Sequence, residues 1–299
     1  MLDDVVKKSV VLFAPLELPD ATPSFFKDAF DDCLRTYDML SENGYTVKIL
    51  GPEEENVLSR KMWRYISALE TARSGSVLRL PLDHCFELAE IRWPRDTFQF
   101  YGDVLCIAPR GKKITKKIFD ALGIPLPEHT VRSSLGEGGM AISAGNALFI
   151  SEGVQNAKIL QVLSARYDIH VLPTPTQFDH RHIDTAISFI PAEKPLLLID
   201  PDYAFEHVEA MIDLVYRLHS ESFIVPMPSP DYELLAVNML VLPDGKVLLP
   251  EVCRETRSFL QKHLPKERIL TCGSDFPNYG KRGLAGGIRC MSNIVYNLY

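Results

Sequence analysis

Short apolar runs alternate with amphipathic stretches along the whole chain. Residues 10–13 and 196–199 are continuous apolar runs of strand length followed by turn-forming residues, and they predict buried strands. Residues 25–43 and 112–122 carry apolar side chains near helical spacing, which predicts amphipathic helices that end at Gly44 and Gly123. The pattern therefore predicts an α/β fold.

The order of these elements repeats along the chain. Strands and single helices alternate, and each repeat has more strands than a simple βαβ unit. The repeat recurs at roughly 55–65 residues, a spacing typical of propeller-like arrays, although residue identities do not repeat with it. Further strands are predicted at 45–50, 77–80, 103–107, 146–150, 168–172, 223–225, 240–242, 246–249 and 268–271, and further helices at 56–72, 154–167, 203–219 and 255–263.

Composition and charge limit the class of protein. The chain has 299 residues, 46% of them apolar and 24% charged, which is typical of a globular protein and suggests two domains of about 150 residues. The net charge of −7 argues against a nucleic-acid binder, which needs a basic face, and weakly favours a small cationic ligand. No apolar stretch is long enough to span a membrane.

The cysteines and the first residues predict a cytoplasmic protein. The cysteines, at positions 33, 85, 106, 253, 272 and 290, form no CxxC pair and are too few for a disulfide scaffold, so we expect reduced thiols. Residues 1–4 are acidic where a signal peptide would be basic, and the apolar run at 10–13 is too short for its core.

Four clusters of polar and reactive residues interrupt otherwise apolar segments. Together they bring one thiol, three carboxylates and an imidazole that is a candidate for catalysis. The clusters are Trp93-Pro94-Arg95-Asp96, Gly136-Glu137-Gly138-Gly139, His180-Arg181-His182-Ile183-Asp184 and Gly286-Gly287-Ile288-Arg289-Cys290-Met291-Ser292-Asn293.

Cys290 and His182 are candidates for a nucleophile and its acid–base partner. A cysteine or a histidine taken alone is more often a buried structural residue, and His180 competes with His182 for any role. A cysteine and a histidine far apart in sequence nevertheless form a standard nucleophilic pair when the fold brings them together. If residues 182–184 are a strand, His182 and Asp184 point to the same face.

The three carboxylates have ordinary interpretations and one shared functional interpretation. Asp96 could form a surface ion pair with Arg95, which would contribute little. Glu137 could be an exposed acid in a glycine turn, and Asp184 could cap a strand edge. Around one site, three carboxylates and a thiolate would repel each other unless a cation were present. One such cation is a guanidinium, which fits carboxylates bidentately and offers an electrophilic carbon. The alternative cation is zinc, but no zinc-ligand spacing in the sequence supports it.

In this order, the four clusters resemble the motifs of the guanidino-group-modifying enzymes of the pentein superfamily. That superfamily comprises arginine deiminases, dimethylarginine dimethylaminohydrolases, agmatine deiminases and amidinotransferases. The matching segments are 93–96 (aromatic-x-Arg-Asp), 137–139 (Glu-Gly-Gly), 182–185 (His-x-Asp-Thr) and 287–292 (Gly-Pro-Arg-Cys-Met-Ser, with isoleucine for proline here). The resemblance implies a single domain over residues 1–299, an α/β propeller of five ββαβ-like units around a pseudo-fivefold axis, with the active site in a central cleft.

The resemblance also implies a role for each site residue. Cys290 is expected to attack the guanidinium carbon and form a covalent thiouronium-type intermediate, while His182 protonates the leaving amine and then deprotonates water. Asp96 and Asp184 are expected to grip the guanidinium, and Glu137 to hold its remaining donors and position His182. The expected function is hydrolysis of a small guanidino compound, such as arginine or a derivative of it, without a cofactor or a metal.

Two departures from the family motifs bear on the substrate. Met140 follows Glu-Gly-Gly where arginine deiminases and dimethylarginine hydrolases usually have Asp. Gly153 follows the Ser-Glu pair where arginine deiminases have an arginine that helps to hold the substrate carboxylate. Arg132, Arg181 or Arg289 could hold such a carboxylate instead.

Other functions stay open. An amidinotransferase would use the same intermediate but pass the amidino group to an amine, and a zinc hydrolase would retain a metal. A non-catalytic pentein would bind a partner protein or the ribosome, although it would have no use for Cys290, His182 and the carboxylates. We expect a small cationic guanidino compound as the partner, with no nucleic acid or membrane, and a homodimer is left open as the assembly.

Overall fold

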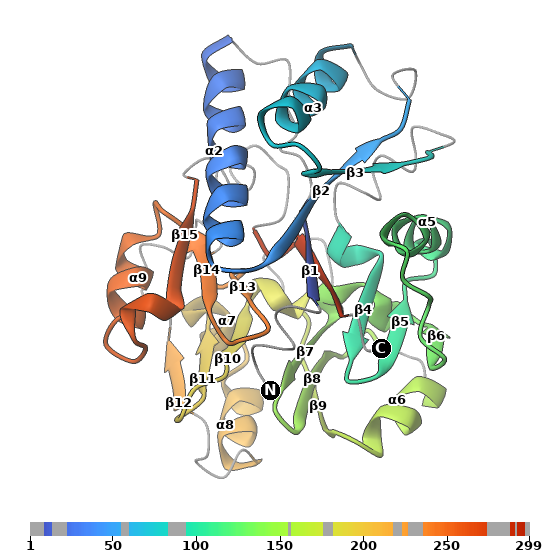
Figure 1. Ribbon diagram of the computed structural model, residues 1–299. Helices are drawn as coiled ribbons and strands as arrows, with labels where there is room; N and C mark the ends of the chain where they lie inside the picture. Colours follow the sequence, from blue (N-terminus) through green and yellow to red (C-terminus); the bar gives the residue numbers. More distant parts are fainter. Residues whose placement is uncertain are drawn as a thin grey trace.

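The computed structural model of the chain has an α/β fold (Figure 1). It describes residues 9–13, 23–54, 60–82, 94–154, 157–175, 182–217, 223–226, 236–273, 288–290 and 292–296. Its strands are β1 (Ser9–Phe13), β2 (Thr46–Pro52), β3 (Val77–Leu80), β4 (Phe98–Tyr101), β5 (Val104–Ile107), β6 (Thr130–Arg132), β7 (Ala141–Ala144), β8 (Ala147–Ser151), β9 (Asp168–Leu172), β10 (Ile187–Ile190), β11 (Leu196–Ile199), β12 (Phe223–Pro226), β13 (Leu240–Val241), β14 (Val247–Pro250), β15 (Ile269–Cys272) and β16 (Ser292–Tyr296).

The described strands form five sheets that share one pairing pattern. The first strand of each sheet pairs antiparallel with the second, and the second pairs parallel with the third. The sheets have the orders β4-β5-β6, β7-β8-β9, β10-β11-β12, β13-β14-β15 and β16-β1-β2-β3, the last with one additional parallel strand. The repeat of element order predicted from the sequence is therefore a repeat of this small sheet.

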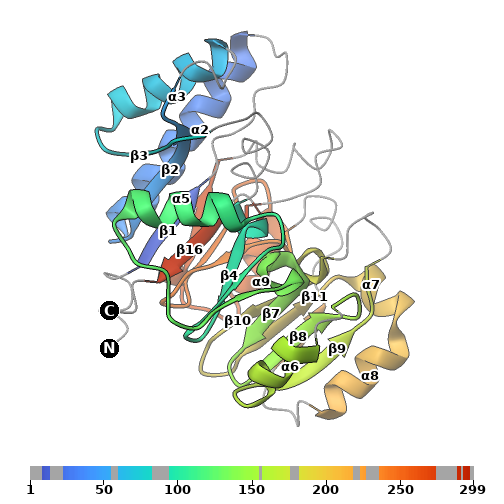
Figure 2. The same ribbon diagram turned by 90° about the vertical axis from the view of Figure 1, so that its right-hand side faces the viewer.

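A helical segment connects the second strand of each sheet to the third, as a parallel pair of strands requires. Figures 1 and 2 show these helices around the outside of the molecule, with the sheets toward its middle. The helices are α2 (Pro23–Glu42), α3 (Arg60–Ala72), α5 (Lys112–Leu122), α6 (Ala157–Ser164), α7 (Pro201–Glu206), α8 (Val208–Arg217) and α9 (Arg254–Leu260).

One sheet unites the two ends of the described chain. Strand β16 pairs antiparallel with β1, from Ser9 opposite Tyr296 to Phe13 opposite Ser292. The segment that carries Cys290 is therefore held in place by a strand from the other end of the chain.

Both faces of the sheets are buried in apolar clusters that join neighbouring sheets. In β8, Leu148 packs in a cluster with Val104 of the β4-β5-β6 sheet, whereas Phe149 packs in another cluster with Leu197 of the β10-β11-β12 sheet. Three more clusters join the β4-β5-β6, β16-β1-β2-β3, β13-β14-β15 and β10-β11-β12 sheets in that order. Burial on both faces explains why these strands are continuous apolar runs without polar alternation.

The periodicity predicts most of the longer elements and misses several short strands. Strands β4, β6 and β7 have only three or four residues, too few for a periodic signal. The single helix predicted at 203–219 is wrong in detail, because α7 ends at Glu206 and α8 begins at Val208 after a non-helical His207. Helix α5 ends at Leu122, directly before Gly123 as predicted, whereas α2 ends at Glu42, two residues before Gly44. Both glycines have positive φ values, 87° and 68°.

No helix in the described ranges is long and apolar enough to cross a membrane. The cysteines that the structure describes, at positions 33, 106, 253, 272 and 290, are all free thiols.

Candidate active site

The predicted site residues stand just before the first strands of different sheets. Asp96 ends a 3-10 turn (η2, Pro94–Asp96) that precedes β4, and Glu137 precedes the turn η4 (Gly138–Met140) and β7. Asp184 lies in a turn (η5, Ile183–Thr185) before β10. Cys290 precedes β16. Because these strands hold equivalent places in their sheets, their starts bring the four segments together.

The backbone between His182 and Asp184 differs from the strand considered for it. Residues 183–185 form a 3-10 turn, and only residues 187–190 are extended as β10. The two side chains therefore do not meet through the alternation of a strand. They converge because the turn directs both toward the Cys290 segment, where each has a contact with that cysteine.

The thiol of Cys290 is buried and has contacts with several polar groups. Its Sγ atom is 4.0 Å from Oδ2 of Asp184, and its side chain is hydrogen-bonded to His182. Its backbone N–H donates to Oδ1 of Asn238 over 3.3 Å, and Nδ2 of Asn238 donates to the carbonyl of Asp184 over 3.2 Å. Asn238 thus connects the Cys290 segment to the Asp184 turn.

His182 lies between two further carboxylates. Its Nε2 atom is 3.7 Å from Oε2 of Glu137, and its Nδ1 atom is 4.0 Å from Oδ1 of Asp96. Gly139 is required beside the ring, since a Cβ atom at that position would lie 2.4 Å from Nδ1 of His182. The Glu-Gly-Gly motif therefore supplies both a carboxylate and the space for the imidazole.

Two buried arginines lie behind the cluster. Nε of Arg289 is 3.1 Å from Oδ2 of Asp184, and both residues are almost completely buried, at 7% and 0% exposure. Arg95 is also buried. It does not form the surface ion pair with its sequence neighbour Asp96 that the sequence analysis considered. Gly138 packs against Arg95, where a Cβ atom would be only 2.5 Å from its Cδ atom.

Burial and neighbouring charges shift the pKa values of three groups in the cluster. Burial raises the pKa of the Cys290 thiol, the charge of Asp184 adds to the rise, and the hydrogen bond from His182 opposes it. Burial alone would lower the pKa of His182, but hydrogen bonds to Cys290 and Glu137 and the charges of Asp96 and Asp184 raise it to about 11. Burial raises the pKa of Asp96 to about 7, against the opposing charge of His182. At neutral pH the cluster therefore holds a thiol and an imidazolium.

Two carboxylate oxygens of the cluster are buried without a hydrogen-bond partner. They are Oδ1 of Asp96 and Oδ1 of Asp184. Buried polar oxygens are costly unless a donor reaches them. A planar cation with several N–H donors would satisfy both.

Several predicted residues stand apart from the cluster. Arg132 is exposed, and its guanidinium donates to the carbonyl of Pro109. Met140 is buried in the core. Glu152 accepts a hydrogen bond from the backbone of Thr174 over 3.1 Å. The predicted residues Trp93, His180, Arg181, Gly286, Gly287 and Met291, with Cys85, lie outside the described ranges.

Two asparagines connect the segments of the cluster: Asn238, which the sequence pattern did not single out, and Asn293, which lies in the fourth polar cluster but was given no role. Asn238 is completely buried before β13, at the position that the predicted site residues occupy before the other first strands. Asn293 donates from Nδ2 to the carbonyls of Pro94 and Phe98 over 2.8 and 2.7 Å, which anchors the Asp96 turn to β16. The signal available for Asn238 was a single amide inside the apolar run at 235–242.

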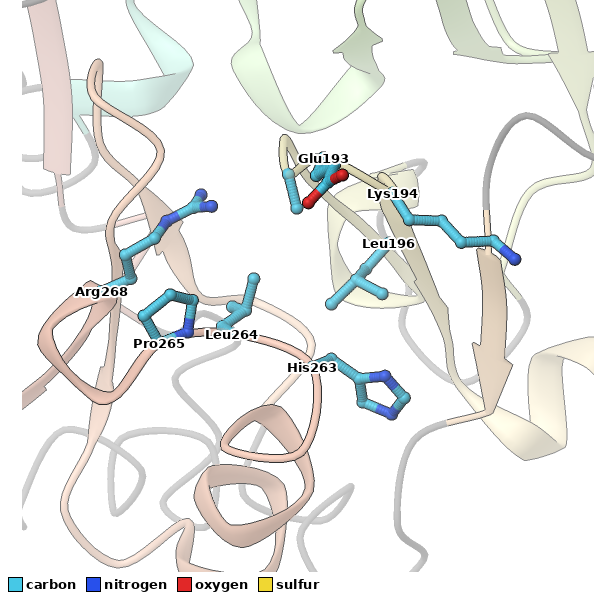
Figure 3. Close-up of a pocket in the computed structure, with 8 residues that line it drawn as sticks. Glu193, Lys194, Leu196, His263, Leu264, Pro265 and Arg268 are labelled. Carbon is cyan, nitrogen blue, oxygen red and sulfur yellow. The ribbon is translucent and has the colours of Figure 1, made fainter.

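One cavity of the structure lies away from the Cys290 cluster. A surface cavity of about 670 Å³ lies between the β10–β11 turn and the segment after α9. Figure 3 shows Glu193 and Lys194 on one side of it and His263, Pro265 and Arg268 on the other, with no residue of the Cys290 cluster among those lining it. Within the described residues, no group of His, Cys, Asp and Glu is arranged to hold a metal ion.

Comparisons with known proteins agree with this geometry at the level of the fold. No family model matches the sequence, and no curated protein matches it. Among solved structures, an agmatine deiminase from C. jejuni matches with a TM-score of 0.64 and 14% identity, over 98% of this chain and 94% of that one.

Two further structures of the same kind match over nearly the full length. A dimethylarginine dimethylaminohydrolase from Pseudomonas aeruginosa, solved with citrulline, has a TM-score of 0.58 and 13% identity, over 96% of this chain and 98% of that one. SxtG, an amidinotransferase from Microseira wollei, has a TM-score of 0.60 and 15% identity, over 97% of this chain and 94% of that one. The chain therefore has the fold of the guanidino-group-modifying enzymes of the pentein superfamily, as the order of its four motifs predicts.

Proposed function

We propose that the protein is a cysteine-dependent hydrolase of a small guanidino compound, of the deiminase or dihydrolase type. The arrangement around Cys290 carries the proposal: its thiol is hydrogen-bonded to His182 and lies 4.0 Å from the buried carboxylate of Asp184. A nucleophile, an acid–base group and unsatisfied carboxylate oxygens are the groups that hydrolysis of a guanidinium needs. Arginine, an arginine derivative and agmatine are the substrates to test first.

Substrate binding follows from the unsatisfied oxygens. The guanidinium would donate to Oδ1 of Asp96 and Oδ1 of Asp184, both buried and without a partner, in charge-assisted hydrogen bonds. Glu137, which is half-exposed at 42%, would accept from the remaining nitrogen at the outer side. The group that would hold a distal carboxylate of the substrate stays a prediction, with Arg132, Arg181 and Arg289 as the candidates. Arg289 is the least suited of the three, because it already forms a buried ion pair with Asp184.

The bound cation would also activate the nucleophile. In the structure, burial and the nearby carboxylate of Asp184 keep the pKa of Cys290 above its ordinary value. A guanidinium beside the sulfur brings a positive charge that offsets Asp184 and favours the thiolate. Substrate binding would therefore release the proton of the thiol to solvent, and the thiolate sulfur would then form a bond to the central carbon.

His182 would move the protons of both half-reactions. Its raised pKa, about 11, means that it carries a proton at neutral pH and can give it to the leaving amine as the carbon–nitrogen bond breaks. The neutral imidazole would then take a proton from water, whose oxygen attacks the thiouronium carbon. Collapse of that adduct breaks the carbon–sulfur bond and releases the ureido product.

A colorimetric screen for ureido product and ammonia tests this function directly. The compounds are arginine, agmatine, methylarginines and other guanidino acids, and the Cys290→Ala protein serves as the blank. We expect turnover of one of them by the unmodified protein and none by Cys290→Ala. Turnover by Cys290→Ala at the unmodified rate would contradict the mechanism.

Two alternatives have their own experiments. An amidinotransferase would release less ureido product when a candidate acceptor amine is added and would yield the amidinated amine, detectable by mass spectrometry. A non-catalytic protein would leave Cys290 unmodified by a haloacetamidine probe. The structural neighbours include hydrolases and an amidinotransferase, so likeness to them does not choose between hydrolysis and amidino transfer.

We further infer that residues 1–299 form one domain in which the five sheets close around a pseudo-fivefold axis. The order in which the apolar clusters join the sheets supports it, because that order returns to the first sheet without a gap. Pairing of β1 with β16 supplies the same closure by hydrogen bonds. A cytoplasmic location and a homodimer stay predictions.

A further inference from the structure

A second cavity, of about 230 Å³, lies where the first strands of all five sheets meet. One lining residue from each of these strands is Gln99 of β4, Ser143 of β7, Phe189 of β10, Val241 of β13 and Asn293 of β16. None of the groups assigned to the chemistry lines this cavity, neither Cys290 nor His182 nor the carboxylates around them. It is therefore a space separate from the Cys290 cluster.

The inner end of the cavity carries two buried guanidinium groups. Arg95 and Arg289 both line it, at 5% and 7% exposure. Arg289 is paired with Asp184 through Nε, but Nε of Arg95 is buried with no hydrogen-bond partner, and no ion pair to Arg95 is found within the described ranges. Within the described ranges the guanidinium of Arg95 therefore has no carboxylate in direct contact, and Asp184 and Asp96 act on it only through the longer-range interaction of charges.

The two arginines also affect each other. Burial lowers the pKa of Arg95 to about 10, and the charge of Arg289 is the next largest cause of that fall. A buried charge without a partner is costly, and repulsion between like charges adds to the cost. A single negative charge placed between the two guanidinium groups would lower both the cost of the unpaired charge and the repulsion between the groups.

The walls of the cavity suit a ligand with an apolar part. Ile142, Phe189 and Val241 line it, together with other apolar side chains. Its outer rim contains the exposed residues Ser143, Gly145 and Pro191, so a small molecule can enter from solvent. The polar inner end and the apolar walls match a carboxylate on a short hydrocarbon chain.

We propose that this cavity is a binding site for a small monovalent carboxylate, held by Arg95 and Arg289. The planar guanidinium groups present paired N–H donors that fit the two oxygens of a carboxylate. This cavity would bind an anion, whereas the unsatisfied carboxylates of Asp96 and Asp184 in the Cys290 cluster would bind a cation. The proposal does not depend on the proposed function.

Calorimetric titration with butyrate, in chloride-free HEPES buffer, tests the proposal. Butyramide is the matched neutral probe, because it has nearly the same shape without the charge. We expect butyrate to bind and butyramide to bind at least tenfold more weakly. Equal binding of the two probes, or no binding of either, would overturn the proposal. Binding of chloride with no binding of butyrate would also overturn it, because it would indicate an inorganic-anion site.

Substitutions at the rim locate the binding without touching the catalytic residues. Ser143 is exposed and lines the cavity, so Ser143→Glu brings a carboxylate into it, whereas Ser143→Gln brings nearly the same volume without the charge. We expect Ser143→Glu to weaken butyrate binding at least tenfold and Ser143→Gln to weaken it much less, with turnover unchanged in both. Equal affinity of the two variants for butyrate would count against the cavity as the site.

Arg95→Gln provides a second, independent test. It keeps a hydrogen-bond donor but removes the unpaired charge, and it should abolish butyrate binding in a protein whose circular dichroism spectrum is unchanged. Retained butyrate affinity in the folded variant would overturn the role of Arg95. If Arg95→Gln fails to fold, the Ser143 pair still decides the proposal.

Discussion

Oδ2 of Asp184 lies 4.0 Å from Sγ of Cys290, and this completely buried carboxylate is, after burial itself, the largest cause of the raised thiol pKa. In Asp184→Asn, that like charge is lost and Arg289 is left as a nearby unpaired cation, so the thiolate becomes more favourable. We expect alkylation of Cys290 by iodoacetamide at pH 7.5 to be roughly tenfold faster than in the unmodified protein, as for a pKa lower by about one unit.

The same substitution should have the opposite effect on turnover. Asp184→Asn loses one of the two carboxylates proposed to hold the guanidinium, and we expect kcat/KM to fall at least a hundredfold. Mass spectrometry of the Cys290 peptide follows alkylation, and Cys290→Ala gives the background from the other thiols. Equal alkylation rates in the two proteins would mean that Asp184 does not control the thiol.

Substrate binding should depend on the ionisation of Asp96. Burial raises its pKa to about 7, so the charged form that holds a cation is present above that pH and is lost as the pH falls through it. In the Cys290→Ala protein, the Kd of agmatine should rise roughly tenfold between pH 8 and pH 6, measured by calorimetry. The Asp96→Asn variant should bind weakly at both pH values, and an undiminished pH dependence in it would assign the titration to another group.

His182 should make stability depend on pH. Because its pKa in the folded protein is raised to about 11, its contribution to stability is fully present below its unfolded pKa, about 6.5, and is lost as the pH rises toward 11. The difference in Tm between the unmodified protein and His182→Gln should therefore shrink from pH 6 to pH 10. A difference that is constant with pH would mean that the imidazolium is not stabilised by Glu137, Asp96 and Asp184.

Gly139 should be indispensable for activity. A Cβ atom there would lie 2.4 Å from Nδ1 of His182, so Gly139→Ala must displace the imidazole from the site. We expect kcat to fall at least a hundredfold in a protein that still folds. Gly44→Ala is the matched control, because a Cβ atom at Gly44 meets nothing within 4 Å, and its positive φ value should cost stability, about 1 kcal/mol, but no activity. Activity retained in Gly139→Ala would contradict the assigned place of His182.

Asn238 should act as a positioning residue for the nucleophile. Asn238→Ala removes the acceptor for the backbone N–H of Cys290 and the donor to the carbonyl of Asp184, at a cost of about 1–3 kcal/mol for each buried group left unpaired. We expect Tm to fall and kcat to fall roughly a hundredfold with little change in KM. Asn43→Ala, which removes one hydrogen bond to Met39 far from the site, should leave kcat unchanged.

The elements that could be predicted from the sequence are those whose length exceeds one turn or one periodic repeat. Helix α5 has the predicted bounds, 112–122, because its apolar spacing and the following Gly123 are local features. Strands such as β4 and β7 form only because a partner strand is present, with Phe98 opposite Ile107 and Ala141 opposite Ile150. Such short strands have no local signal of their own.

The candidate site shows the same division. Asp96, Glu137, His182, Asp184 and Cys290 were recognisable because reactive groups interrupt apolar runs in a known order. Asn238 was not, because an amide in an apolar run has no reactive group, and its role depends on two partners, Cys290 and Asp184, more than fifty residues away in the sequence.

By itself, the sequence determined the α/β class, the repeated order of elements and the chemical groups available for a reaction, because periodicity and residue type are properties of short segments. Tertiary structure alone decided that the segments before β4, β7, β10 and β16 meet around Cys290, that Arg289 pairs with Asp184, and that Arg95 is buried with an unpaired Nε. It also decided the pKa values, since burial and neighbouring charge arise only when distant segments pack together.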